Sequence, residues 1–138
     1  MFQSRDEVRQ VYLQVWQKLQ DQSLLEPMEA IIADVIQLHP EYHQWLVAGE
    51  STTEKDFSPE DGQTNPFLHM GMHITLREQS ASDRPAGIQG IYQKLVQQKG
   101  IHDAEHAMIE CLGEVLWTAQ RMNTMPDENA YLASLRKL

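Results

Sequence analysis

Apolar side chains recur at helical spacing along almost the whole chain, and this pattern constrains the fold most. Near the start, Val8, Val11, Tyr12, Val15 and Trp16 share one face of a helix. Strict alternation of apolar and polar residues, which is typical of half-buried strands, is nearly absent. The sequence therefore predicts an all-α protein, a compact helical bundle of five or six helices.

Prolines and capping residues indicate where these helices begin and end. Ser4 with Glu7 three residues later forms a capping box. Asn65 followed by Pro66 is typical of a helix start, and we expect that helix to reach about residue 79. Pro40 disfavours helical backbone at the residue before it, so a break or kink is expected there. The remaining helices are expected after Pro27, after residues 82–85, over about 102–122 and after Thr124.

The length and charge of the chain limit what it can be. A chain of 138 residues suits one hydrophobic core, so residues 1–138 are expected to form a single helical domain. With 11 basic and 20 acidic side chains the net charge is −9, and no basic stretch is present. General binding to nucleic acid or to a membrane is therefore not expected. The single cysteine, Cys111, and the charged first residues without an apolar signal segment favour a cytoplasmic location.

A polar segment from about residue 47 to residue 64 separates two of the expected helices. It contains Gly49, Pro59 and Gly62 among serines, threonines and acidic residues. A connector of this length inside a compact domain is usually mobile or functional. We interpret the segment as a mobile connector or as a lid over a site.

All six histidines fall into three pairs with one spacing, four residues apart. The pairs are His39 and His43, His69 and His73, and His102 and His106. Residues four apart lie one above the other on a helix, so both imidazoles of a pair can reach one ion. Imidazole is the commonest metal ligand of proteins, and helical bundles build metal sites between facing helices. The repeated spacing therefore predicts a metal site between helices.

The third pair has carboxylates beside it. At about 100° per residue, Glu110 continues the row of His102 and His106, and Glu105 lies about 60° to the other side. A carboxylate next to two imidazoles suits iron, manganese or zinc. We expect Glu110 to be a ligand and Glu105 to be a catalytic proton shuttle or the partner of a ligand. The residues from His102 to His106 also match the inverted zinc-protease pattern, but those enzymes are much larger than this chain.

The first pair fits a metal site least well, because Pro40 prevents a straight helix between its two members. Glu29 or Glu41 could replace one of them as a ligand. A histidine hydrogen-bond network without metal remains the alternative for all three pairs. The expected ligand set is His39, His43, His69, His73, His102, His106 and Glu110.

Seven short runs stand out together: NPFLHM at 65–70, EQ at 78–79, DRP at 83–85, AEH at 104–106, ECLGE at 110–114, HPEYH at 39–43 and AQR at 119–121. They resemble a small proteobacterial family that is catalogued only as a domain of unknown function. The resemblance covers nearly the whole chain and implies a bacterial, intracellular, single-domain protein. It implies no activity, cofactor or substrate.

The ligand chemistry is similar to that of hemerythrin-like helical bundles, which bind two irons with histidine pairs and carboxylates. The second histidine pair and the row of His102, His106 and Glu110 are similar to that ligand set. The interruption at Pro40 and the lack of an evident bridging aspartate depart from it. The likeness is one of site chemistry, and ligand analogy does not fix function.

Two functions of different classes are consistent with these patterns. The first is a small cytoplasmic metal-binding helical protein with iron, or else zinc or manganese, in a mononuclear or dinuclear site. As an enzyme it would be a metal-dependent oxidoreductase using dioxygen or peroxide on a small-molecule substrate, with a metal hydrolase as a weaker variant. The alternative is a non-enzymatic acidic helical interaction module whose histidines are structural or bind a structural zinc. Neither interpretation identifies a protein partner.

Overall fold

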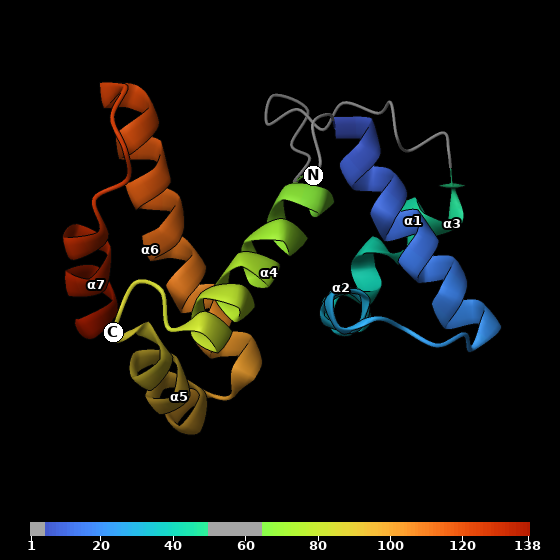
Figure 1. Ribbon diagram of the computed structural model, residues 1–138, viewed down its shortest axis with the longest axis horizontal. Coiled ribbons are helices and arrows are strands. Elements are labelled where there is room, and N and C mark those ends of the chain that lie inside the picture. Colours follow the sequence, from blue (N-terminus) through green and yellow to red (C-terminus); the bar gives the residue numbers. More distant parts are fainter. Residues whose placement is uncertain (1–4, 50–64) are drawn as a thin grey trace. The chain divides into compact units, whose positions relative to one another are not determined.

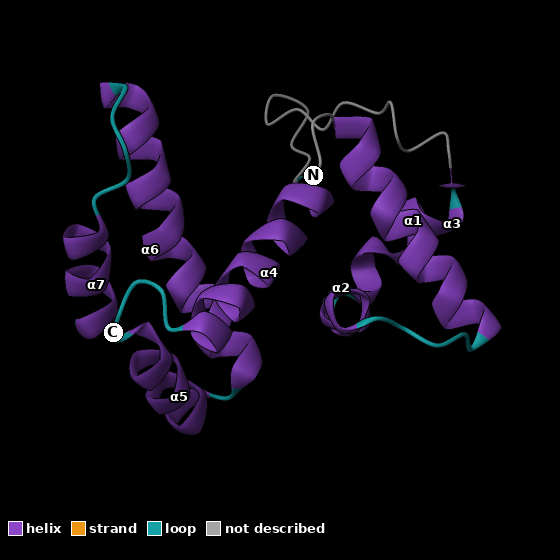
Figure 2. Cartoon of the chain, in the orientation of Figure 1, coloured by secondary structure: helices purple, strands orange, loops and turns teal. Residues whose placement is uncertain are grey.

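The computed structural model describes residues 5–49 and 65–138, and this part of the chain is helical without any strand (Figure 2). The helices are α1 (Arg5–Asp21), α2 (Pro27–Gln37), the 3-10 helix η1 (Pro40–Tyr42), α3 (His43–Val47), α4 (Pro66–Ser82), α5 (Ile88–Lys99), α6 (Ile101–Met122) and α7 (Glu128–Arg136) (Figure 1). The all-α prediction is confirmed. Seven α-helices are described where five or six were expected, and the additional one is α3, a short helix beyond the break at Pro40.

The start of α4 follows from its first two residues. The side-chain oxygen of Asn65 accepts hydrogen bonds from the backbone N–H groups of Phe67, at 3.0 Å, and Leu68, at 3.2 Å. These are two of the donors that a helix start leaves without partners, and Pro66 needs no partner because it has no N–H. The helix ends at Ser82 rather than near residue 79.

Aspartate side chains accept hydrogen bonds from backbone N–H groups near the starts of α5 and α7. The carboxylate of Asp83 accepts from the backbone N–H groups of Gly87 and Gln89, each at 3.0 Å. This turn takes up residues 83–87, so α5 begins at Ile88, beyond residues 82–85. Asp127 caps α7 by accepting from the N–H of Ala130 at 3.0 Å.

Pro40 breaks the chain as expected. Helix α2 ends at Gln37, and His39 has a non-helical backbone (φ −126°, ψ 64°) before η1 begins at Pro40. His39 and His43 therefore do not lie on one straight helix. The expected capping box at Ser4 lies outside the described residues, as does most of the polar segment expected over about 47–64, namely residues 50–64.

The chain divides into two compact units, residues 1–71 and residues 72–138, and the division falls within α4. In the first unit α1 packs against α2 and α3. Val15, Val35 and Ile36 are fully buried there, and Lys18 of α1 forms a salt bridge of 2.7 Å with Glu29 of α2. The single-domain organisation of residues 1–138 stays a prediction.

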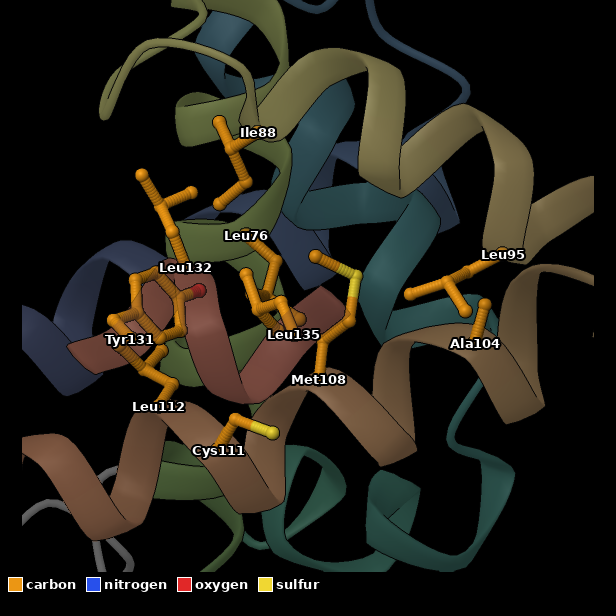
Figure 3. Packing of buried hydrophobic residues seen from close by; sticks show 10 residues of the cluster. All are labelled: Leu76, Ile88, Leu95, Ala104, Met108, Cys111, Leu112, Tyr131, Leu132 and Leu135. Atoms are coloured by element: carbon orange, nitrogen blue, oxygen red, sulfur yellow. The ribbon is translucent and has the colours of Figure 1, made fainter. Parts of the chain in front are cut away.

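In the second unit α6 packs along α5 and α7, as Figure 1 shows. Leu76 of α4, Ile88 of α5, Met108 of α6 and Leu135 of α7 meet in one apolar cluster and are almost completely buried (Figure 3). Each of the four helices therefore buries one apolar face in a shared core.

None of the described helices is both long enough and apolar enough to cross a membrane. The longest, α6, has 22 residues and carries several acidic side chains along its length. A bilayer crossing needs about 20 predominantly apolar residues in succession.

The core of the second unit predicts a stability difference between two methionines. Met108→Ala, at a position with 0% exposure, should lower the free energy of unfolding by about 2–5 kcal/mol, because it leaves a cavity. Met125→Ala, at a position with 86% exposure, should change it by less than about 0.5 kcal/mol. Urea unfolding followed by circular dichroism measures both. Equal effects of the two substitutions would contradict this packing.

Candidate metal centre

A buried carboxylate lies at the centre of the polar contacts in the second unit. Glu105 of α6 is 0% exposed. It accepts a hydrogen bond from the Tyr92 hydroxyl of α5 at 2.6 Å, and two residues of α4 complete the set. Arg77 donates from Nε at 3.0 Å and from Nη2 at 3.3 Å, and His73 donates from Nδ1 at 2.8 Å. A buried charge is tolerated only when it is paired and hydrogen-bonded, and Glu105 meets that condition.

The hydrogen bonds decide the charge state of Glu105. Burial by itself would raise the pKa of this carboxyl, but the bonds from His73, Arg77 and Tyr92 outweigh burial and hold the pKa below its ordinary value. The group is therefore a carboxylate at neutral pH and can only accept hydrogen bonds. Consequently Nδ1 of His73 carries the hydrogen, and Nε2 of neutral His73 carries a lone pair.

His106 has the same tautomer for a different reason. Its Nδ1 lies 2.8 Å from the backbone carbonyl oxygen of His102, one turn earlier on α6. A carbonyl oxygen only accepts, so Nδ1 again carries a hydrogen, and in the neutral ring Nε2 keeps its lone pair. The rings of His73 and His106 lie edge to face, with centroids 4.7 Å apart.

His39, in the first unit, has this tautomer as well. Its side chain is 2% exposed, and its Nδ1 donates to the carbonyl oxygen of Val35 at 2.8 Å. Pro40 ends the helical region here, and the backbone N–H of His39 donates to the carbonyl of Ile36 rather than to that of Val35. The carbonyl of Val35, near the end of α2, is bound by the His39 side chain in place of the backbone N–H. The His39 ring lies edge to face with the His69 ring, with centroids 5.2 Å apart.

Tyr42 lies beside both of these rings. It stacks on His39 with centroids 5.5 Å apart and an interplanar angle of 4°, and it contacts the edge of His69. Burial, with a smaller contribution from Glu41, raises the pKa of Tyr42, so its hydroxyl is neutral at physiological pH.

His43 differs from the other predicted ligands in its tautomer. Its Nε2 donates to the carbonyl oxygen of Ile36 at 2.9 Å, and its ring packs against Trp16. His43 thus satisfies a second carbonyl at the end of α2, and only its Nδ1 retains a lone pair.

His102 and Glu110 are exposed on α6, one turn before and one turn after His106. The His102 ring contacts the His106 ring, with centroids 4.2 Å apart. The buried face of α6 is centred on Ala104, Glu105 and Met108, so the row expected to face the site is turned toward solvent at both of its ends. The ligand roles of His102 and Glu110 stay predictions.

Two partners of Glu105 were missed from the sequence. Neither Tyr92 nor Arg77 was among the expected site residues. The signal was present in α6, where an acidic residue falls within the apolar face and therefore requires buried donors. Spacing alone does not say which helices supply those donors.

The fold and this site define an all-helical protein with a buried histidine that is hydrogen-bonded to a buried carboxylate. The family model for a domain of unknown function, DUF1841, matches residues 4–137, so the chain belongs to that family. No curated protein and no solved structure matches the chain. The expected membership of a family described as a domain of unknown function is confirmed.

The contacts of Glu105 predict how Tyr92→Phe affects stability. Loss of the hydroxyl removes one hydrogen bond to a buried charge, so the free energy of unfolding should fall by about 1.5–3 kcal/mol at neutral pH. A glutamate with a lowered pKa stabilises the fold above its ordinary pKa, and this contribution disappears as pH falls through the lowered value. The difference from wild type should therefore shrink on acidification.

Tyr42→Phe is the matched control, because the Tyr42 hydroxyl has no hydrogen bond among the described residues, and its effect should be small. Urea unfolding at a series of pH values measures both variants. A difference for Tyr92→Phe that is absent, or that does not depend on pH, would contradict the assigned charge state of Glu105.

Proposed function

We propose that this protein binds one divalent transition-metal ion through His39, His69, His73 and His106. Each of these histidines offers one ring nitrogen as a possible ligand atom. Three of the ligand atoms are assigned as Nε2, those of His39, His73 and His106, because Nδ1 of each is engaged with an oxygen.

The shared tautomer carries the proposal. A histidine that binds a metal almost always donates its other ring N–H to a carboxylate or a backbone carbonyl, which fixes the tautomer and the ring orientation. His73 donates to the carboxylate of Glu105, and His39 and His106 donate to carbonyls, all at 2.8 Å. In the neutral ring this leaves Nε2 of each of the three with a lone pair, and that is the form that binds metal.

Helix α4 supports joining the two pairs of rings into one set. His69 and His73 are one turn apart on this helix and so project from the same face. The His39 ring contacts the His69 ring, and the His106 ring contacts the His73 ring. Each member of the proposed set thus has another member as its neighbour.

The donor set favours some metals over others. Imidazole suits iron, zinc, copper and nickel, whereas manganese prefers oxygen ligands. We propose iron first and zinc second, and the all-imidazole set makes manganese a weaker candidate than the sequence suggested. Four histidines suffice for one ion, so a single ion is proposed in place of a dinuclear centre. The absence of a carboxylate from this set also separates it from the hemerythrin-like ligand set.

The role proposed for Glu105 is to position His73. Its carboxylate is held by three donor residues, so it orients the imidazole of His73 and increases its basicity, which strengthens metal binding. Iron accepts more than four ligands, and a position left for a small molecule is what dioxygen or peroxide chemistry requires. Such a reaction, a cytoplasmic location and a proteobacterial origin are further parts of this proposal.

The proposal predicts the metal content of matched variants. Protein purified without an affinity tag should contain about one equivalent of iron or zinc per chain, measured by mass spectrometry of the elements. His106→Ala should reduce the content to below about a tenth, because losing a ligand commonly weakens binding by several kcal/mol. His102→Ala, one turn away and exposed, should retain the metal.

Circular dichroism must show that both variants remain helical. Full occupancy in His106→Ala, or a wild-type protein that takes up no iron, zinc, copper or nickel, would leave the histidines as structural residues. That outcome would favour the non-enzymatic acidic module.

A further inference from the structure

Two adjoining hollows lie on the surface of the second unit. One, of about 500 Å³, lies between the C-terminal half of α6 and α7. The other, of about 630 Å³, is lined by α4, α6 and the residues around the start of α7. Val115 and Met125 line both hollows, so the two meet along one groove. Neither hollow includes any of the histidines.

Apolar side chains are unusually exposed along this groove. Met122 is 66% exposed and Met125 is 86% exposed, and Leu116 on the same part of α6 is also exposed. Their flexible thioether side chains let methionines adapt to partners, and they recur at surfaces that bind amphipathic segments. Trp117 lies next to Leu116 on α6 and is exposed too, with Arg121 over its ring at 5.2 Å.

The charged residues of the groove all have one sign. Glu114 and Asp127 line the first hollow, and Glu128 lines the second. Among the described residues that line either hollow there is no lysine, arginine or histidine. An apolar floor with carboxylates at its rim is complementary to a segment with apolar side chains on one face and basic side chains beside them.

We propose that this groove binds an amphipathic, basic helix of a partner protein. A helix of this kind places apolar residues at positions i, i+3, i+4 and i+7 into a hydrophobic groove, and its lysines or arginines then face the rim carboxylates. A second copy of this chain fits less well, because two chains with a net charge of −9 repel each other. Binding of this partner would not involve the histidines.

The probe is a synthetic 18-residue peptide of leucine and lysine with leucines at helical spacing, titrated by calorimetry into the full chain. The control peptide has the same composition in scrambled order, so it keeps the charge and loses the apolar face. The helical peptide should bind at least tenfold more tightly than the scrambled one.

Two variants of the groove test its two components. Met125→Lys should weaken binding at least tenfold, whereas Leu24→Lys, at a position with 95% exposure in the first unit, should change it less than twofold. Glu114→Lys should weaken binding several-fold and more than Asp21→Lys, which removes an exposed carboxylate elsewhere. All four positions are exposed, so the variants should fold.

Three outcomes would overturn the proposal. The first is equal affinity for the helical and scrambled peptides. The second is equal weakening by each groove variant and its control. The third is a concentration-dependent dimer, seen by analytical ultracentrifugation, that Met125→Lys dissociates, since the groove would then be an interface between two copies of the chain.

Discussion

The burial of one carboxylate is the constraint on which the rest of the second unit depends. Removing an ion such as Glu105 from water costs several kcal/mol, and only well-placed partners offset that cost. The partners come from two other helices, His73 and Arg77 from α4 and Tyr92 from α5. The N-terminal half of α6 is therefore held by directional bonds as well as by apolar packing. The same bonds fix one tautomer of His73.

A second constraint of a different kind acts at the end of α2. Pro40 ends the helical region and leaves carbonyl groups without their usual partners, and the side chains of His39 and His43 take two of them. His39 donates from Nδ1 and His43 from Nε2, so the same break gives the two histidines opposite tautomers. Of this pair, only His39 matches the tautomer of His73 and His106. Pro40 thus helps to determine which of the two histidines has the tautomer that suits a metal.

Local patterns in the sequence were enough to predict most of the helices. Asn65 and Pro66 start α4, and Pro40 separates α2 from η1, as their chemistry predicts. Spacing did not reveal which rings meet, because the contacts of His39 with His69 and of His73 with His106 join residues far apart in the chain. Glu110 follows the histidine row along the helix, whereas the apolar face of α6 buries Glu105. Such outcomes depend on tertiary packing, which periodicity along one helix does not contain.

The most direct measurement of the central claim is the tautomer of each imidazole. A long-range proton–nitrogen correlation spectrum of the chelator-treated protein, labelled with nitrogen-15 in histidine, distinguishes the two neutral forms at neutral pH. Single substitutions assign the signals. We expect hydrogen on Nδ1 in His39, His73 and His106, and on Nε2 in His43. Hydrogen on Nε2 of His73, or a mixture of forms at all three positions, would contradict a preformed imidazole site oriented by Glu105 and by the backbone carbonyls.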